Sequence, residues 1–391
     1  MGFIIILHII TYLMLFLILY AFFLYPLLIK LISVFINKPV IKNKDYQPEV
    51  TILMSAYNEE ELISDAVHSV FGNSYPPGKI KLIIGSDGSN DNTNTILDNL
   101  KREYDNIDVY YFNRVGKNAV LNDLIKKVNT ELVFFLDADL RIPENTLTNL
   151  VSSFGDPTIG SVISRLNIIA EEDTDNIGRK GETLYQKYET GIRINESKIY
   201  TTVNSLGTLH GIRTKCFQNI PNDKVCDDLH IILQPPYYHL RTVFDDENET
   251  IEVRKKSLSN ELQRRVRTTA GSLSAILSNK KLLYPKFGWV SYFLWSHKII
   301  RLFTPIFLIT LLISTGLLAN YSEILFYLLV LQIGFYLFAF LGWILEKMQI
   351  KFLPARMAFF FISVNYGFFV GIVRFFKGRQ NAIWEKISDA R

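Results

Sequence analysis

Residues 132–140 of the chain read LVFFLDADL, a run of apolar residues that ends on two aspartates one residue apart. A short apolar run that stops at a polar turn is typical of a strand buried in a parallel sheet. Three similar runs lie upstream, at 50–55 (VTILMS), 80–85 (IKLIIG) and 109–112 (VYYF). Because helix-forming segments separate these runs, the pattern predicts an α/β domain whose sheet is covered by helices on both faces.

The predicted helices begin beside polar residues. Asn58 is placed to cap the first helix, and Glu59–Glu61 would then lie in its first turn, where acidic side chains are favourable. A second helix is predicted to begin near Asp91, and a third to run over residues 117–127.

Polar residues gather where the predicted strands end. Ligands of open parallel sheets bind beyond the carboxyl ends of the strands, so these residues are candidates for one common site. They are Tyr57, Asn58, Asp87, Arg114, Lys117, Asp137 and Asp139. The chain has neither GxGxxG nor GxxxxGKS/T, which gives no support for a dinucleotide or P-loop site. Carboxylates that bind Mg²⁺ together with substrate phosphates are the alternative.

The acidic residues at these strand ends also allow structural interpretations. Asp87 lies in SDGSNDNT, whose residues favour turns. An EF-hand loop that starts there is excluded, because its sixth and twelfth positions would be Asn92 and Asp98 rather than Gly and Glu. Alternate residues of an extended segment point the same way, so Asp137 and Asp139 could face one cation, or could instead form a helix cap or a surface turn.

Two later motifs are equally open. Asp227 and Asp228, in VCDDLHII, could cap a helix, or Asp228 could be a general base beside an acceptor hydroxyl. Arg264, Arg265 and Arg267, in LQRRVRT, could stabilise a departing diphosphate, because positioned cations stabilise developing negative charge. They could also form a basic face that meets anionic lipid.

Four stretches free of Asp, Glu, Lys and Arg are candidate membrane segments: 1–29, 302–322, 324–345 and 357–373. About 20 apolar residues cross a bilayer. Basic residues follow the first stretch, precede the second and follow the third, which by the positive-inside rule places the central domain in the cytoplasm. They are Lys30, Lys38, Lys42, Lys44, Lys298, Arg301, Lys347, Lys351 and Arg356.

The last stretch does not fit this pattern. Arg374 and Lys377 follow it, so a spanning helix would place a basic tail outside, whereas a re-entrant or interfacial helix would keep that tail inside. Residues 288–301 (GWVSYFLWSHKIIR) suit a helix that lies in the interface. The first stretch has no basic n-region and no cleavage site, so we expect a retained anchor rather than a signal peptide.

The composition excludes several classes of protein. The 391 residues are 49% hydrophobic and 20% charged, which is enough to build a core and excludes disorder. Only two cysteines are present, Cys216 and Cys226, which excludes a disulfide scaffold. A net charge of +4 gives no support for a nucleic-acid partner. The apolar stretches hold no intramembrane charge, which argues against a transporter.

Taken in order, six motifs resemble those of the family 2 membrane glycosyltransferases, which include cellulose, chitin and hyaluronan synthases. The motifs are SAYNEE (55–60), SDGSNDNT (86–93), VGKNAVLN (115–122), LDADL (136–140), CDDLHI (226–231) and RRVRT (264–268). With the apolar stretches that follow them, they cover most of the chain. The resemblance implies a GT-A fold, an inverting transfer from a UDP-sugar donor, and Mg²⁺ or Mn²⁺ as cofactor.

The resemblance implies that four residues bind the nucleotide. Tyr57 and Glu59 resemble the start of the motif that contacts the base and ribose. Asp87 resembles the acid that reads the uracil ring, and Lys117 resembles the lysine on the nucleotide side.

The resemblance also implies a metal site and a catalytic base. Asp137 and Asp139 resemble the DxD pair, with Asp139 as the more direct metal ligand, and Asp228 resembles the base. Arg264, Arg265 and Arg267 align with the QxxRW element that contacts the donor diphosphate, and Arg267 takes the place of its Arg. Arg264 replaces its Gln and Thr268 replaces its Trp, which puts processive synthesis in doubt.

The expected domain organisation has five parts. A transmembrane anchor covers 1–37, a GT-A domain 45–270, interfacial amphipathic helices 271–301, transmembrane helices 302–376, and a basic tail 377–391.

The leading functional interpretation is an enzyme that adds sugar to a growing polysaccharide or a lipid-linked glycan at the cytoplasmic face of the membrane. The expected partners are the UDP-sugar, the acceptor and membrane lipid, with a homo-oligomer or a secretion partner left open. Single addition to a lipid-linked acceptor is one alternative, and a non-catalytic membrane partner with the same fold is another. Further residues could bind the acceptor or pack as ordinary helix residues: Tyr185, Tyr188, Glu189, His210 and Arg213.

Overall fold

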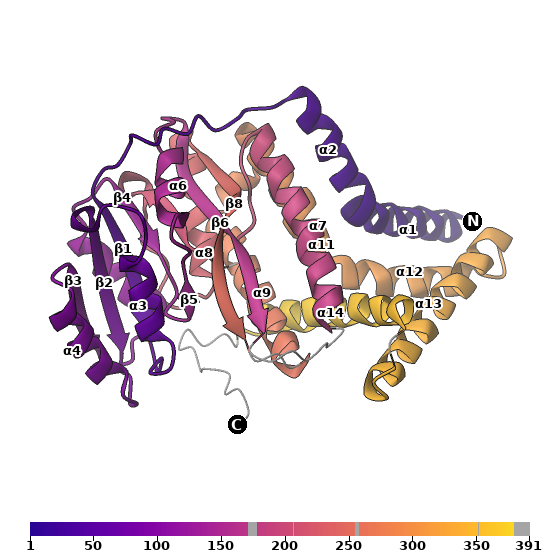
Figure 1. The fold of residues 1–391 in the computed structure, drawn as a ribbon. Helices are drawn as coiled ribbons and strands as arrows, with labels where there is room; N and C mark the ends of the chain where they lie inside the picture. The colour runs from indigo at the N-terminus through magenta and orange to yellow at the C-terminus, as the bar shows by residue number, and fades with distance from the viewer. Residues whose placement is uncertain (171–177, 206, 255–257, 351, 379–391) are drawn as a thin grey trace.

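The computed structural model describes residues 1–170, 178–205, 207–254, 258–350 and 352–378. It shows an α/β domain beside a group of long apolar helices (Figure 1). The N-terminal helices and the helices that follow the domain lie on the same side of it.

One mixed sheet of eight strands forms the domain, in the order β3-β2-β1-β4-β7-β6-β8-β5. The first four strands of this order are parallel to one another. They are β1 (Val50–Ala56), β2 (Ile80–Asp87), β3 (Ile107–Phe112) and β4 (Leu132–Phe135). These strands contain the apolar runs of the sequence, so the predicted parallel α/β arrangement is confirmed for this half of the sheet.

The other half of the sheet is not purely parallel. β7 (His210–Arg213) runs antiparallel to both β4 and β6 (Ile159–Ala170). β6 pairs in parallel with β8 (Arg241–Arg254), and β5 (Leu140–Arg141) adds a short antiparallel pair to β8. Apolar runs do not reveal this arrangement, because strand direction depends on how distant segments are connected.

Helices cover the sheet and extend toward the apolar group (Figure 1). They are α3 (Ile63–Phe71), α4 (Thr93–Glu103), α5 (Lys117–Leu124), α6 (Thr146–Ser153), α7 (Gly178–Ile199), α8 (Asp227–Ile232) and α9 (Leu258–Ser278). A 3₁₀ turn at Ile125–Lys127 extends α5, so the helix predicted over 117–127 is confirmed.

The first helix begins later than predicted. Asn58 has a left-handed backbone with φ of 55°, turns follow it, and α3 starts only at Ile63. Asn58 Oδ1 accepts a hydrogen bond from Asn90 N at 2.9 Å, and Thr93 Oγ1 accepts one from Glu59 N at 2.8 Å. The prediction that Asn58 caps this helix is therefore wrong, because its side chain joins the loop after β1 to the loop after β2.

The apolar helices lie on both sides of the domain in sequence. α1 (Gly2–Leu19), a π-helical turn (Tyr20–Leu24) and α2 (Tyr25–Phe35) precede it. After it come α10 (Trp289–Phe293), a second π turn (Leu294–Ile299), α11 (Ile300–Leu302), α12 (Thr304–Leu318), α13 (Glu323–Lys347) and α14 (Leu353–Phe376).

Within the described residues, length and composition identify three helices that could each cross a membrane. They are Gly2–Phe35, Glu323–Lys347 and Leu353–Phe376. The pair Trp289–Leu302 and Thr304–Leu318, which is bent by 57°, is a fourth candidate if it forms one span. Each of the four charge-free stretches therefore coincides with a candidate helix.

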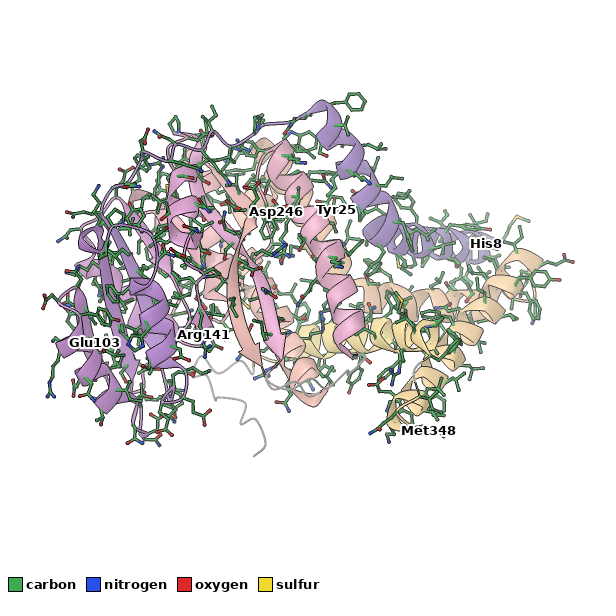
Figure 2. All side chains as sticks on the ribbon, viewed as in Figure 1. His8, Tyr25, Glu103, Arg141, Asp246 and Met348 are labelled. Atoms are coloured by element: carbon green, nitrogen blue, oxygen red, sulfur yellow. The ribbon has the colours of Figure 1, made fainter. Side chains whose placement is uncertain are left out.

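The domain and the apolar helices share a core. One cluster of buried side chains includes Tyr25 from α2, Ile192 from α7, Phe293 from α10 and Phe368 from α14. Figure 2 shows Tyr25 at the point where α2 meets the domain. The two parts therefore form one packed unit.

Gly211 of β7 allows a test of how tightly this sheet is packed. It pairs with Phe134 of β4, and a Cβ atom at Gly211 would lie 2.7 Å from Cζ of that ring. We expect Gly211→Ala to lower the free energy of unfolding by about 2 kcal/mol, as over-packed cores do. Gly191→Ala in α7 is the control, because its Cβ would meet nothing within 4 Å. Thermal unfolding in detergent micelles should give it unchanged or raised stability, and equal losses in both variants would contradict the packing argument.

Candidate active site

Asp87 is the buried anchor at the end of β2. Its Oδ1 accepts hydrogen bonds from Val115 N at 2.6 Å and Gly116 N at 3.1 Å, and its Oδ2 accepts one from Arg114 Nη1 at 2.5 Å. Gly116 supplies the sharp turn with φ of 94°, a conformation that L side chains rarely adopt. The carboxylate therefore holds the loop after β3 at the end of β2.

Arg114 also covers an aromatic ring from the neighbouring loop. Its guanidinium carbon lies 3.4 Å from the centroid of the Tyr57 ring. The guanidinium is attracted to the electron-rich face of the ring, so the stacked pair forms a flat platform. Tyr57, Asp87 and Arg114, which the sequence placed at one sheet edge, are thus brought together.

Lys117 connects this edge of the sheet to the LDADL and CDDLHI motifs that come later in the chain. Its Nζ lies 2.6 Å from Asp137 Oδ1 and 2.9 Å from Asp227 Oδ2. Burial alone would lower the pKa of Lys117, but the two carboxylates outweigh burial and raise the pKa above its ordinary value. The ammonium group is therefore charged at neutral pH and bridges the end of β4 to the start of α8.

Asp137 and Asp139 lie on a tight turn. Leu140 N donates a hydrogen bond to Asp137 O at 3.1 Å, so this segment is not extended as the sequence argument assumed. Both side chains are half-buried at the carboxyl end of β4. The assumption of an extended segment was wrong, although both acids do lie at the predicted edge.

The acids at this edge are suited to bind a cation whose remaining ligands come from a bound molecule. Among the described residues, no group of three or more His, Cys, Asp or Glu could hold a metal ion without help. Mg²⁺ is commonly bound by one or two carboxylates plus substrate phosphates, and Asp137 with Asp139 matches that donor set. The residues present therefore fit a divalent cation that binds together with a phosphorylated ligand.

Asp228 lies in the first turn of α8. Its Oδ2 accepts a hydrogen bond from Gly207 N at 2.9 Å, which orients one oxygen and leaves the carboxylate half-buried. Cys226, just before the helix, has a left-handed backbone with φ of 64°. Burial and the neighbouring Asp228 raise the pKa of the Cys226 thiol, so it stays protonated.

The three arginines of α9 do not point the same way. Residues three apart share a helix face, whereas residues two apart do not. Arg267 lies among Cys226, Asp137 and Asp227, and burial lowers its pKa from the ordinary value. Arg264 is close enough to Arg267 to lower that pKa further.

Arg265 faces the apolar helices. Its guanidinium carbon lies 5.1 Å from the centroid of the Tyr185 ring and 5.5 Å from that of Phe360. These contacts hold α9 between α7 and α14. Arg264 and Arg267 lie on the side of the helix that faces the acids.

A second charged cluster, which the sequence analysis missed, lies where α7 meets the apolar helices. Glu189 and Glu196 lie seven residues apart on α7, about two helical turns, and both are almost fully buried. His297 lies between them, with Nε2 3.0 Å from Glu189 Oε2 and Nδ1 2.7 Å from Glu196 Oε1. Arg301 donates a hydrogen bond to Glu189, and Tyr25 Oη donates one to Glu196 at 2.6 Å.

This buried charged cluster also reaches the loop beside Asp228. Asn204 Nδ2 donates to Glu189 Oε2 at 2.9 Å, and Lys298 donates to Asn204. Thr202 Oγ1 donates to Glu196 Oε2 at 3.0 Å. Glu189 was predicted only as an acceptor candidate. The one sequence signal for the cluster was a run of His297, Lys298 and Arg301 inside an otherwise apolar helix.

The remaining acceptor candidates have structural roles. His210 Nδ1 bonds to Thr208 O at 2.8 Å, and its ring stacks on Phe135. Arg213 pairs with Glu131 and donates to backbone carbonyls. Tyr188 Oη donates to Phe22 O at 2.8 Å, which ties α7 to the N-terminal helices. For these residues the packing interpretation fits best.

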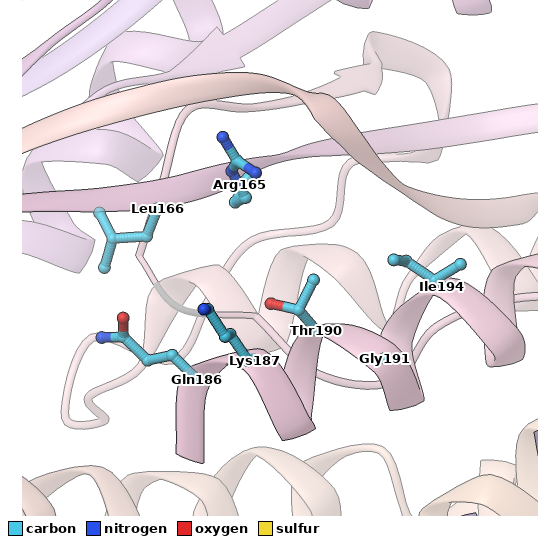
Figure 3. Close-up of a pocket in the computed structure, with 7 residues that line it drawn as sticks. All are labelled: Arg165, Leu166, Gln186, Lys187, Thr190, Gly191 and Ile194. Carbon is cyan, nitrogen blue, oxygen red and sulfur yellow. The ribbon is translucent and has the colours of Figure 1, made fainter. Parts of the chain in front are cut away.

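A cavity of about 310 Å³ lies apart from the acids, between β6 and α7 (Figure 3). Its lining residues are Arg165, Leu166, Gln186, Lys187, Thr190, Gly191 and Ile194. Arg165 is paired with Glu249 at 2.7 Å. None of the predicted site residues lines this cavity, so the sheet edge rather than the cavity remains the candidate site.

Comparison with known proteins identifies the fold. The solved structure of the mannosyltransferase PcManGT from Pyrobaculum calidifontis, in complex with GDP-Man and Mn²⁺, superposes with a TM-score of 0.71. The match covers 94% of this chain and 99% of that one, at 19% sequence identity. The domain is therefore a GT-A-like α/β sheet followed by long apolar helices, as predicted.

Sequence comparison finds a family match over part of the chain. Residues 51–220 match the glycosyl transferase family 2 model. A beta-monoglucosyldiacylglycerol synthase from Synechocystis sp. is 31% identical over 127 residues. A poly-beta-1,6-N-acetyl-D-glucosamine synthase from Staphylococcus aureus is 34% identical over 128 residues. Each match covers 32% of this chain, and 26% and 31% of the respective relatives, so less than a third of either is spanned.

Glu189 gives a pH-dependent test of the buried charged cluster. Burial alone would raise the pKa of Glu189, but Arg301 and His297 hold it well below its ordinary value. A carboxylate whose pKa is lower in the folded chain than in the unfolded chain stabilises the folded state at every pH above its ordinary pKa, about 4.3 for glutamate. This stabilisation is lost as the pH falls from that value toward the lower pKa of the folded state. At pH 7 we expect Glu189→Gln to cost about 3 kcal/mol, because it leaves Arg301 buried without its carboxylate.

The cost should shrink as the pH falls below about 4, which thermal unfolding of both proteins across pH would show. Glu103→Gln is the matched control, since Glu103 is exposed on α4 far from the buried charged cluster (Figure 2). A cost that stays constant with pH would contradict the assignment of a charged Glu189.

Proposed function

We propose that the chain is an inverting glycosyltransferase that transfers a sugar from a UDP-sugar to a glycan or lipid-linked acceptor. The observation that carries the proposal is the gathering of acids and cations at one sheet edge. Asp87, Asp137 and Asp228 come from three distant segments, yet Lys117 and the loop contacts bring their elements to the same edge. The family match over residues 51–220 supports the same reaction class.

The nucleotide would bind at the Tyr57 and Arg114 platform. Asp87 fixes Arg114 and the loop amides, and we propose that this rigid edge receives the uracil ring. Glu59, whose amide is bonded to Thr93 Oγ1, lies beside this edge in the loop after β1. A flat platform of an aromatic ring and a guanidinium suits a planar base, because bases stack on both kinds of group.

The diphosphate would bind between the turn after β4 and α9. Lys117 and Arg267, with Arg264 beside it, supply fixed positive charge at this place. Asp137 and Asp139 would hold Mg²⁺ or Mn²⁺, which neutralises the phosphates and stabilises the departing diphosphate when bound. The complex of the similar mannosyltransferase with Mn²⁺ and a nucleotide sugar supports this assignment.

Asp228 would take the proton from the acceptor hydroxyl. Its Oδ2 is held by the Gly207 amide, and the contacts of the described residues leave Oδ1 to accept the proton as the hydroxyl oxygen attacks the anomeric carbon. The bond from that carbon to the diphosphate breaks in the same step, which inverts the configuration. A single displacement requires no second carboxylate as a covalent nucleophile.

The acceptor class divides the proposal into two forms. One similar relative makes a polymer of N-acetylglucosamine and another makes a glucosyl lipid. In the first form the chain extends a polymer, and in the second it adds one sugar to a lipid-linked acceptor. Thr268, which stands where the resemblance expects Trp, favours single addition. The catalytic edge would face the cytoplasm, in agreement with the basic residues that flank the apolar stretches.

A donor screen tests the proposed activity directly. Purified protein in lipid nanodiscs would be incubated with Mn²⁺ and UDP-glucose, UDP-N-acetylglucosamine, UDP-galactose or UDP-glucuronate, and UDP release would be measured. We expect one donor to be preferred, and product length would then separate the two forms. Absence of both UDP binding and UDP release with these donors, together with binding of another nucleotide sugar, would overturn the UDP assignment.

Asp228→Asn tests the base. The amide keeps the shape and the Gly207 contact but accepts no proton, so we expect transfer to fall by about 10²–10⁴-fold. Binding of UDP, measured by calorimetry, should be unchanged, because Asp228 does not face the nucleotide in this proposal. Asp223→Asn is the matched control, since Asp223 is exposed and pairs with its neighbour Lys224. Normal turnover in Asp228→Asn would remove this residue as the base.

Lys117→Met tests the cation at the diphosphate. The variant loses one phosphate contact and leaves Asp137 facing Asp227, so we expect UDP affinity to fall by about tenfold or more. Lys126→Met is the control, because Lys126 is exposed and pairs with Asp123 three residues away. The measurement is calorimetric titration with UDP and Mn²⁺, and equal affinities in the two variants would contradict the assignment.

A further inference from the structure

The last apolar helix, α14, is long enough to cross the membrane, but basic residues lie at its C-terminal end. A helix of its length could cross the membrane, which would carry Lys377 to the far side. The packing of its two ends bears on the choice.

The C-terminal half of α14 packs against α9, the helix that carries the arginines. A Cβ atom at Gly371 would lie 2.5 Å from Thr269 Cβ and 2.9 Å from Val266 O. A Cβ atom at Gly367 would lie 3.2 Å from Arg265 Cβ. The backbones of α9 and α14 therefore approach closely along this half, and α9 contacts Cys226 through Thr268 O on its other side.

The N-terminal end of α14 packs against the end of α13. Gly342 of α13 lies against the backbone of Ala355, and Arg356 Nε pairs with Glu346 Oε2 at 2.9 Å. α13 is the returning helix of a hairpin with α12, and the chain enters α12 from residues that are bonded to α7. If α12 and α13 both cross the membrane, the end of α13 lies on the side of the domain.

We propose that α14 does not cross the membrane but lies at the lipid surface on the side of the catalytic domain. Both of its ends are then held on that side, by α13 at one end and by α9 at the other. The basic residues Arg374 and Lys377 fall on the same side as Lys347 and Arg356, which removes the one conflict with the positive-inside rule.

The exposure pattern of α14 fits a helix with protein on one face and lipid on the other. A third of its most apolar window (33%) is buried in the structure, compared with 6% for Gly2–Phe35 and 17% for α13. Its exposed large apolar and aromatic side chains are Leu353, Met357, Tyr366, Phe369 and Phe376. Aromatic side chains beside terminal basic residues are typical of helices in the membrane interface.

This placement gives the bilayer surface a part in holding the site. α9 lies between α14 and α8, and Arg265 is fixed between Tyr185 and Phe360. A helix anchored in the interface would thus hold the opposite face of α9, with Arg267, against the acids. The occupant of the exposed face of α14 is the lipid surface itself.

Side-specific cysteine labelling tests the placement of α14 without reference to activity. Lys377→Cys, Tyr321→Cys in the α12–α13 loop and Lys44→Cys before β1 would each be treated with a membrane-impermeant maleimide, in intact cells and after permeabilisation. The unsubstituted chain gives the background from Cys216 and Cys226. We expect Lys377→Cys to be labelled like Lys44→Cys and opposite to Tyr321→Cys.

Labelling of Lys377→Cys from the same side as Tyr321→Cys would overturn the proposal, because α14 would then cross. Labelling of all three from one side would also overturn it, because the hairpin would not cross. These outcomes are independent of whether the protein transfers sugar, so they do not depend on the proposed function.

Gly371→Val tests the contact with α9. The added side chain must displace Thr269, so we expect transfer to fall by about tenfold or more, as misplaced positioning groups do. Gly334→Val in α13 is the matched control, because its Cβ would meet nothing within 4 Å. Equal turnover in the two variants would contradict the role of α14 in positioning α9.

Discussion

The ammonium group of Lys117 is the interaction on which the candidate site depends. It lies between Asp137, at the end of a central strand, and Asp227, at the start of a helix ninety positions later in the chain. Two carboxylates this close would repel each other without a cation between them. One lysine and two flanking acids put both signs of charge at this edge, which the proposed binding of a diphosphate with a divalent cation would require. In that proposal, folding of the edge and binding of a charged ligand rest on one set of groups.

The same constraint, that buried charges must be paired, joins the domain to the apolar helices. Glu189 and Glu196 are buried on α7, and His297 and Arg301 reach them from the helices that precede α12. Apolar contacts alone would allow these helices to slide or rotate, because they are not directional. A buried set of hydrogen-bonded charges fixes one geometry. Asn204 extends that geometry to the loop that holds Asp228.

Much of the fold could be predicted from the sequence, because apolar runs and turn residues are local signals. β1, β2 and β4 lie where VTILMS, IKLIIG and LVFFL predict them. The antiparallel β7 could not be predicted, since its pairing with β4 joins segments far apart in the chain. The capping role of Asn58 failed for a similar reason, because a nearby loop, rather than its own helix, receives the side chain.

The candidate site was predicted as a set of residues but not as an arrangement. Sheet geometry brings strand ends together, so the sequence alone groups Asp87, Lys117 and Asp137. The buried charged cluster around Glu189 was not predicted, because the sequence of an amphipathic helix does not show which of its carboxylates is buried. The different position of Arg265 could not be predicted from the motif. The motif assigns one role to all three arginines, whereas an α-helix points successive residues to different faces.

That turn of the helix explains how α9 serves two neighbours at once. Arg264 and Arg267 are three residues apart and share one face, toward the acids and Cys226. Arg265 lies on the other face, between rings of α7 and α14. A rotation of α9 about its own axis, caused by a change in the apolar helices, would therefore also move Arg267 relative to the acids. The spacing of the arginines thus links the apolar helices that pack behind α9 to the candidate site through one rigid helix.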